Sequence, residues 1–159
     1  QCDWSSDVCS SDLYKMETLE NILRLWETDA VMDQTEPSKE LLKIPTLHSK
    51  YLNILTKHKI ASKKTHFDYL KMKKTKTEYF GGKLSQEELQ EYGWEPFQFV
   101  LKSDLSTYLE ADKDLIKLLE KKVYHDECIS VIESIMQELK QRTWQLRDFI
   151  SWEKFVAGQ

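Results

Sequence analysis

Apolar and polar residues follow a helical period along most of this chain. From Met16 to Asp33, apolar side chains recur every three or four positions, which predicts an amphipathic helix carrying Leu19, Ile22, Leu23, Trp26 and Ala30. Thr35-Glu36-Pro37-Ser38 interrupts this pattern, and Ser38 is suited to cap a short turn that runs to Leu42. Pro45 is expected to mark the next boundary, because the residue before a proline is disfavoured in the helical conformation.

A longer helical pattern runs from Leu47 to Phe80 without a glycine or a proline. Its apolar positions mark one face that drifts around the axis: Leu47, Tyr51, Ile54, Leu55, Ala61, Phe67, Leu70 and Tyr79. Lysine is a good helix former, so we expect one helix of roughly eight or nine turns over 47–80. Gly81-Gly82 is expected to end it.

The second half of the chain is also predicted to be helical. Ser85 and Glu88 have the spacing of a capping box, which predicts a short acidic helix that ends before Gly93-Trp94-Glu95-Pro96. Residues 97–101 are expected to be extended, and Ser103 or Asp104 to begin a further helix. Its helical pattern continues to Phe155. The predicted fold is therefore all-α: a helical protomer with a long lysine-rich helix and a C-terminal oligomerisation helix.

Apolar residues in the last third of the chain lie nearly all round the predicted helix. One small domain can hardly cover them all, and an exposed apolar patch of this kind is typical of an interface. We interpret this region, within 104–155, as an assembly region, and predict that the oligomer interface includes Ile129, Ile132, Ile135, Met136, Leu139, Phe149 and Trp152. The alternative is an ordinary terminal helix whose apolar residues are buried within the protomer.

Composition narrows the class of protein. A length of 159 residues suits one domain, and four glycines with three prolines are too few turn residues for a sandwich of many strands. There is no run of about 18 apolar residues, and the three cysteines give no disulfide framework. We expect a cytosolic protein in which residues 16–159 form a single helical domain.

The first 15 residues are expected to be a non-native tail. Cys2–Leu13 reads CDWSSDVCSSDL, which has an internal echo but neither an apolar period nor a capping signal. It resembles the translation of a common sequencing adapter. The natural start is then expected at Met16 or just upstream of it.

Charge is distributed very unevenly along the chain. Between Lys50 and Lys83 there are ten lysines and only two acids, Asp68 and Glu78, so this segment has a net charge of about +8. The whole chain is at −4, so the remaining residues sum to about −12. A basic band inside an acidic protein is typical of a surface that meets polyphosphate, although a solvated lysine face is the plainer alternative.

Other candidate chemistry is incomplete. His125 and Cys128 would supply only half of a structural zinc site. The acids Glu110, Asp112 and Asp114 suit the first turn of a helix better than a two-metal site. Gly81-Gly82-Lys83 lacks the remaining residues of a phosphate-binding loop. We therefore expect no catalytic residues, no metal and no cofactor, and hence no enzyme.

The basic segment favours nucleic-acid binding. Lysines neutralise phosphates, and aromatic faces can stack on unpaired bases without regard to base sequence. No zinc-finger or helix-turn-helix pattern is present, which favours sequence-independent binding of a single strand. Each interleaved aromatic residue (Tyr51, His58, His66, Phe67, Tyr69, Tyr79) could stack on a base or pack in the core. The predicted DNA-binding residues are Lys57, Lys59, Lys63, Lys64, His66, Lys71, Lys73, Lys74 and Lys76.

Several segments, in this order and spacing, carry a resemblance to a known family. They are LKIPTLHSKYL (42–52), the lysine helix as far as Asp68-Tyr69, EYFGGK (78–83), EADKD (110–114) and RDFISWEKF (147–155). Together they resemble the UvsY family, the recombination mediators of T-even-type phages, and in particular its cyanophage branch. The resemblance covers Met16 to Gln159.

The resemblance implies a non-enzymatic protein that binds single-stranded DNA and forms a ring-like homo-oligomer in the cytoplasm of the infected host. It implies that the protein helps the phage recombinase to replace the phage single-strand-binding protein, in recombination, repair and recombination-dependent replication. The family's DNA-binding helix falls on 63–69, where the T-even branch has an arginine at the position of His66. A neutral imidazole does not replace the charge of a guanidinium group. The family's assembly element corresponds to 123–155.

Two other classes of protein stay open. One is a helical oligomeric scaffold or interaction protein whose lysine face does not bind DNA. The other is a nuclease that uses Glu110, Asp112 and Asp114 with magnesium.

Overall fold

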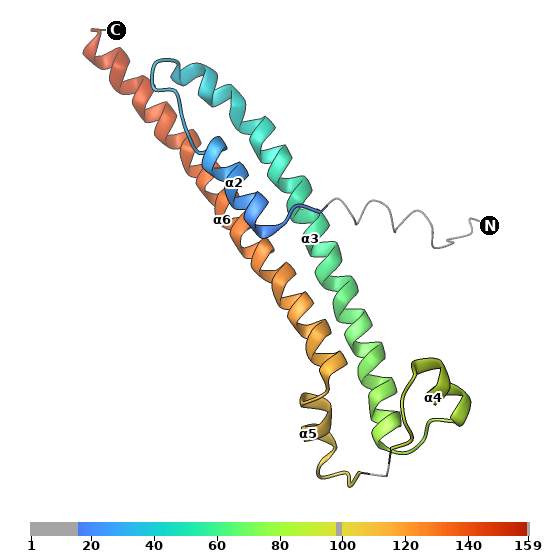
Figure 1. Ribbon diagram of the computed structural model, residues 1–159. Helices are drawn as coiled ribbons and strands as arrows, with labels where there is room; N and C mark the ends of the chain where they lie inside the picture. The colour runs from blue at the N-terminus through green and yellow to red at the C-terminus, as the bar shows by residue number, and fades with distance from the viewer. Residues whose placement is uncertain (1–15, 98–99, 159) are drawn as a thin grey trace, which may run out of the picture. The chain divides into compact units, whose positions relative to one another are not determined.

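The computed structural model describes residues 16–97 and 100–158, and all of the regular structure in these ranges is helical (Figure 1). In chain order the helices are α2 (Leu19–Asp29), α3 (Pro37–Phe80), α4 (Gln86–Tyr92), α5 (Leu105–Glu110) and α6 (Lys113–Val156). The predicted all-α class is confirmed. The adapter-like tail lies outside the described residues, as do two residues of the segment predicted to be extended (98 and 99).

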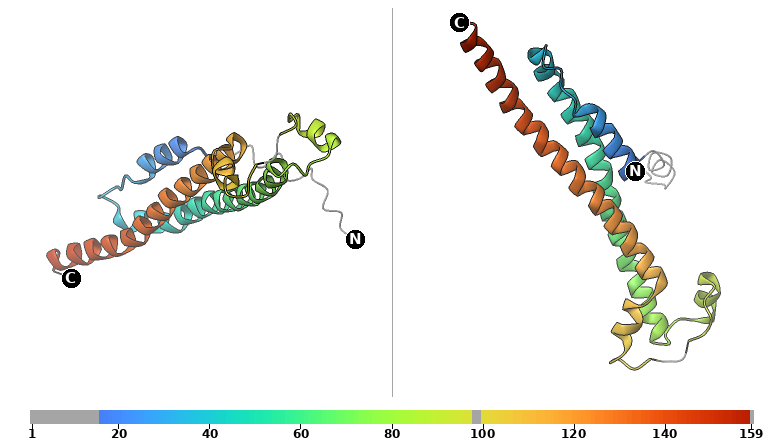
Figure 2. Two further views of the ribbon diagram at one scale, coloured as in Figure 1. Left: turned by 90° about the horizontal axis from the view of Figure 1, so that it is seen from below. Right: turned by 60° about the vertical axis from the view of Figure 1, so that its left-hand side comes forward.

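The helices form two compact units. The first comprises the chain up to Ile60 together with the residues from His125 onward, and the second is Ala61–Tyr124. The two longest helices, α3 and α6, have 44 residues each and contribute to both units; Figure 2 shows them from two further directions. No helix in the described part of the chain is long and apolar enough to cross a membrane.

The core of the first unit is built by α2, α3 and α6. One apolar stripe of each helix is buried there, as the helical period of the sequence requires. Its buried members are Ile22 from α2, Tyr51, Ile54 and Leu55 from α3, and Cys128, Ile132, Ile135 and Leu139 from α6.

Polar contacts hold α2 at both ends. Thr18 caps its N-terminus, because its hydroxyl oxygen accepts a hydrogen bond from the backbone N–H of Asn21 at 3.2 Å. At the other end, Arg142 of α6 donates to the carbonyl oxygens of Asp29 and Ala30 at 3.0 and 3.1 Å. These carbonyls have no partner within the helix, so the buried guanidinium group satisfies them.

The prediction that Pro45 marks a boundary was wrong, because α3 begins at Pro37 and continues through Pro45. A proline inside a helix leaves the carbonyl four residues earlier without its N–H donor and crowds it. Contacts on both sides of Pro45 offset this cost: Glu40 is buried before it, and Tyr51 is fully buried after it and bonded to Asp29 at 2.9 Å. Tertiary packing therefore overrides the local signal.

The predicted end of α3 at Gly81-Gly82 is confirmed. Gly82 has φ +65°, a conformation that residues with a Cβ rarely adopt. The N–H of Gly82 bonds to the carbonyl of Tyr79 at 3.0 Å, and that of Lys83 to Glu78 at 2.9 Å. This pair of bonds is a Schellman motif, which satisfies carbonyls that the end of a helix leaves free.

In the second unit, α4 begins with the predicted capping box. The Ser85 hydroxyl accepts from the N–H of Glu88, whose carboxylate accepts from the N–H of Ser85 at 2.8 Å. Asp104 is the N-cap residue of α5, as expected, but α5 ends at Glu110. The side chain of Asp112 then accepts from the backbone N–H groups of Asp114 and Leu115, both at 3.0 Å, and so begins α6.

Candidate nucleic-acid interface

One face of α3 in the second unit is rich in exposed lysine. Ala61, Thr65 and Lys76 are buried on the opposite side of the helix, so a period of 3.6 residues turns the intervening positions outward. Five of the predicted DNA-binding residues are exposed there: Lys63, Lys64, His66, Lys71 and Lys74. Lys73 is exposed as well, with its ammonium group 5.9 Å from the centre of the Tyr69 ring.

These charges are scarcely neutralised within the protein. In the described part of the chain, Lys63, Lys64 and Lys71 have no carboxylate within ion-pairing distance. The Nζ of Lys74 is 3.9 Å from a carboxylate oxygen of Glu78, and the lysine side chain is still 79% exposed. Exposed pairs of this kind contribute little. The face therefore presents free positive charge to solvent, which is what a phosphate backbone requires.

Two other predicted lysines, Lys57 and Lys59, belong to the first unit and are exposed there. Lys59 pairs with Glu133 of α6 at 2.6 Å, and both side chains are about half exposed. Lys57 lines a pocket of the first unit.

Lys76 was predicted to bind DNA, but the structure buries it in the second unit. Its side chain is 7% exposed, and Nζ lies 2.9 Å from Asp112 and 2.7 Å from Asp114. The ammonium group also lies 4.0 Å from the centre of the Trp94 ring, a cation–π contact. Burial by itself would lower the pKa of Lys76, but the bonds to Asp112 and Asp114 outweigh it, so the pKa is raised and the group stays charged.

Lys76 therefore holds α3 to the start of α6 rather than facing solvent. Sequence reasoning placed the two acids correctly at the start of a helix but missed the partner that they hold. Lys76 lies on the same helical stripe as Tyr69 and Met72. This spacing was the signal in the sequence that could have indicated its burial.

The structure shows which of the interleaved aromatic residues are buried and which are exposed. The sequence had left open whether each packs in the core or could stack on a base. Tyr51 and His58 are fully buried in the first unit. Tyr79 packs against Phe80, Trp94 and Phe97 at ring-centre distances of 5.2, 5.0 and 5.6 Å. Tyr51, His58 and Tyr79 therefore serve packing. Tyr69 is half-buried, and the neighbours His66 and Phe67 are the exposed rings of the lysine face.

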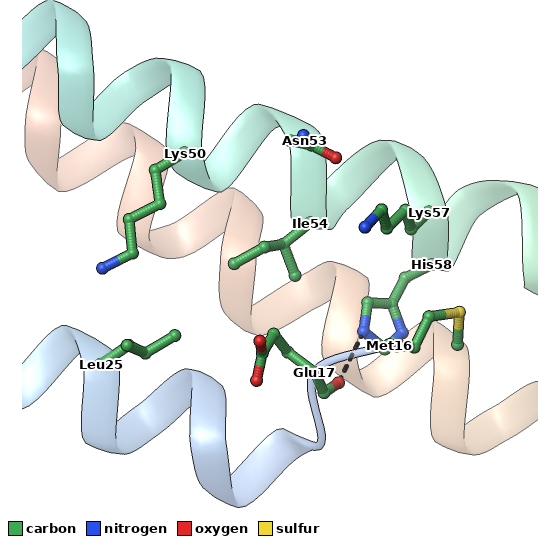
Figure 3. A pocket seen from close by; sticks show the side chains of 8 residues that line it. All are labelled: Met16, Glu17, Leu25, Lys50, Asn53, Ile54, Lys57 and His58. Carbon is green, nitrogen blue, oxygen red and sulfur yellow. Dashed lines mark hydrogen bonds between the residues drawn. The ribbon is translucent and has the colours of Figure 1, made fainter. Parts of the chain in front are cut away.

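The first unit has an open pocket of about 320 Å³ between α2 and α3, shown in Figure 3. It is lined by Met16, Glu17, Leu25, Lys50, Asn53, Ile54, Lys57 and His58. Nε2 of His58 donates to the carbonyl oxygen of Glu17 at 3.1 Å, and its Nδ1 lies 3.2 Å from Nδ1 of His125. Among the described residues, the lining contains no serine or cysteine beside the histidine that could form the nucleophile and base pair of a hydrolase. His125 thus meets a second histidine, and no group of three or more metal-ligating side chains occurs among the described residues.

The residues predicted to form an oligomer interface divide into two groups. Ile132, Ile135 and Leu139 are buried in the core of the first unit, and Ile129 and Met136 pack partly buried against it. Ile132, Ile135 and Leu139 are thus covered within the protomer, as in an ordinary buried helix, whereas Ile129 and Met136 are covered only in part. Phe149 and Trp152 are 39% and 62% exposed, and Trp144 and Phe155 are exposed with them near the end of α6. A helical apolar period shows that a stripe is covered but does not show what covers it.

The fold and this face define a class of protein: a set of packed helices with an unneutralised lysine face of the kind that binds nucleic-acid backbones. Comparison with known proteins narrows the class. Residues 25–159 match the family described as recombination, repair and ssDNA-binding protein UvsY, and the chain belongs to that family.

Solved structures share the fold. Three crystal structures of the bacteriophage T4 recombination mediator protein UvsY match with TM-scores of 0.77, 0.73 and 0.71, at 20%, 18% and 19% identity. They cover 89%, 88% and 85% of this chain and 98%, 99% and 98% of the T4 chains. No curated protein sequence matches the chain.

Proposed function

We propose that this protein is a non-enzymatic recombination mediator that binds single-stranded DNA through the lysine face of α3 in the second unit. The face is formed by Lys63, Lys64, Lys71, Lys73 and Lys74, with His66 beside them. The observation that carries the proposal is that these side chains are exposed and that the first three have no acidic partner among the described residues. Family membership supplies the expected ligand.

The proposal includes two further phage proteins, the recombinase and the single-strand-binding protein. The mediator loads the recombinase onto strands that are covered by the single-strand-binding protein, in the cytoplasm of the infected host, during recombination, repair and recombination-dependent replication. A helix offers only a few phosphate contacts, so weak sites gain most when several copies engage one strand. We therefore propose a homo-oligomer, ring-like in form, as the active species.

Replacing Lys63 and Lys64 together with alanine tests DNA binding. Affinity for single-stranded DNA should fall about equally for all base sequences, because phosphate contacts carry no sequence information. The slope of log affinity against log salt should flatten by roughly 0.7 for each phosphate that the variant no longer neutralises. Titration of a labelled oligonucleotide at several salt concentrations measures both quantities.

A matched control removes the same charge elsewhere. Lys117 and Lys121 are exposed on α6, so the double alanine variant should keep the parent salt slope. An equal loss of affinity in both double variants would mean that only net charge matters. A parent protein that binds no single strand at moderate salt would favour the scaffold function instead.

A further inference from the structure

Phe67 is an exposed aromatic side chain in the middle of the lysine face. It is 58% exposed, although a phenylalanine on a solvated helix surface gives up the free energy that its burial would supply. Scattered exposed apolar residues are common, so exposure alone would need no explanation. The position of Phe67 among the lysines is what distinguishes it.

Helix geometry places Phe67 on one stripe with three of the unneutralised or weakly paired lysines. Lys63 lies four residues before it, Lys71 four residues after it and Lys74 seven residues after it, and positions at these spacings share a face. Lys63 and Lys71 are separated by about 12 Å along the axis, at 1.5 Å per residue. The position of Phe67 therefore lies between two lysines along the axis of α3. Residues 63–74 belong to the green part of that helix in Figure 1.

Several other aromatic side chains of the second unit are packed against protein partners, and Tyr69 is half-buried with the Lys73 ammonium group 5.9 Å from its ring centre. Phe80, for example, is 7% exposed, and its ring contacts Phe97 and Tyr108 at 5.3 and 5.6 Å. Among the described residues, Phe67 meets one ring, that of its exposed neighbour His66, at 6.2 Å and an angle of 45°. More than half of the Phe67 side chain is thus accessible to a ligand.

We propose that Phe67 stacks on an unpaired base, and that this contact makes the lysine face select single strands over duplex DNA. This inference rests on the proposed function and adds the residue that distinguishes single-stranded from duplex DNA. The flanking lysines hold the phosphates on either side of the stacked base. In a duplex, base faces are already stacked on their neighbours, so only the phosphate contacts remain available to this face.

The test compares a ring with an apolar side chain of similar size. Phe67→Leu removes the ring, whereas Phe67→Trp keeps one. Both are measured against a thymidine oligonucleotide, an oligonucleotide of the same length with abasic sites, and a duplex. Phe67→Leu should weaken binding to the thymidine strand about fivefold or more, with an unchanged salt slope, because no charge was removed.

The abasic strand makes the test specific for stacking. It keeps the phosphates but offers no base, so the parent and Phe67→Leu should bind it equally, and they should bind the duplex equally. Phe67→Trp should retain the parent affinity for thymidine. Leu70→Ala is the matched control, because Leu70 is 48% exposed three residues away and has no ring, and it should bind like the parent.

The inference is overturned if Phe67→Leu binds the thymidine strand as tightly as the parent. It is also overturned if the affinity for the abasic strand falls by as much, since the leucine would then act through the helix or through the phosphates. Either result leaves the proposed function intact. Absence of any single-strand binding by the parent would instead remove the proposed function and this inference with it.

Discussion

At the scale of single residues, burial rather than residue type decides what a lysine of α3 does. Lys74 and Lys76 are two positions apart, so they point to different sides of the helix. Lys74 is exposed beside Glu78, whereas Lys76 is enclosed by Trp94, Asp112 and Asp114. The first is available to a ligand, and the second is part of the structure of its unit.

Replacing Lys76 with alanine should destabilise the protein by about 3 kcal/mol, because it leaves the mostly buried Asp112 carboxylate without its counterion. Urea unfolding measures this change in stability. Lys74→Ala is the control and should change the free energy of unfolding by less than about 0.5 kcal/mol. A Lys76→Ala variant as stable as Lys74→Ala would contradict the structural role of this lysine.

The buried pair of His58 and His125 has a defined arrangement of protons. A carbonyl oxygen only accepts, so Nε2 of His58 donates to Glu17. In the neutral ring Nδ1 of His58 is then an acceptor, and it receives the Nδ1–H of His125 at 3.2 Å. A proton on Nδ1 of His58 would set two N–H donors against each other.

Stability should therefore fall in mild acid. Burial lowers the pKa of His58 below its usual value of about 6.5, although the bond to the Glu17 carbonyl acts in the opposite sense. The unfolded chain takes up this proton near pH 6.5 and the folded chain only at lower pH. The contribution of the neutral ring is thus complete above about pH 6.5 and is lost as the pH falls toward the folded pKa.

Urea unfolding at about pH 7.5 and about pH 5.5 measures the effect. His58→Gln should be less stable at the higher pH but should show a smaller fall between the two. His66→Gln is the control, because it removes a histidine that is exposed and is not part of the buried pair. An unchanged dependence in His58→Gln would show that other groups cause the fall.

At the scale of elements, α3 contains two prolines with opposite consequences. Pro37 occupies the first position of the helix, where the missing N–H would have had no partner in any case. Pro45 lies inside the helix, where the missing N–H removes a hydrogen bond.

Pro45→Ala should raise the free energy of unfolding by about 1 to 3 kcal/mol, since it restores the bond to the carbonyl of Leu41 and relieves crowding. The gain is partly offset because proline also restricts the unfolded chain. Pro37→Ala should be neutral or slightly destabilising. Thermal or urea unfolding of the two variants distinguishes them, and equal effects would mean that the position within the helix does not matter.

At the scale of the whole molecule, the apolar residues of α6 lie in two different environments. Those on one stripe are buried against α2 and α3 of the same chain, whereas several aromatic residues near its end stay exposed. Exposed aromatic residues on one helix end are suited to association with other copies.

Changing Trp152 and Phe155 to glutamate should give smaller species in light scattering with an unchanged melting temperature, because both side chains are exposed. Affinity for a long single strand should fall as well, although no lysine is altered, because fewer linked sites engage it.

Ile132→Glu is the contrasting variant, and it should unfold the protein because it places a charge in the core. If the variants of Trp152 and Phe155 form oligomers of the same mass as the parent protein, the assembly surface lies elsewhere.

Much of this structure could be predicted from the sequence where a local signal acts alone. The end of α3 at Gly82 and the capping box at Ser85 each depend on a few neighbouring residues, and both are confirmed. The first helix was predicted over Met16 to Asp33, and α2 is shorter, Leu19–Asp29, because Thr18 caps it. Family membership was also accessible, because it rests on the order of several segments.

The sequence by itself determined the helical class, the capping box at Ser85, the end of α3 at Gly82 and the dense positive charge of α3, because propensity, capping and charge are properties of a residue and its near neighbours. The tertiary structure alone decided that Pro45 stays within a helix, that Lys76 is buried, that Ile132 belongs to the core and that Phe67 faces solvent. Each of these outcomes depends on which distant segment covers a given face. A periodic pattern marks the face but does not specify its partner.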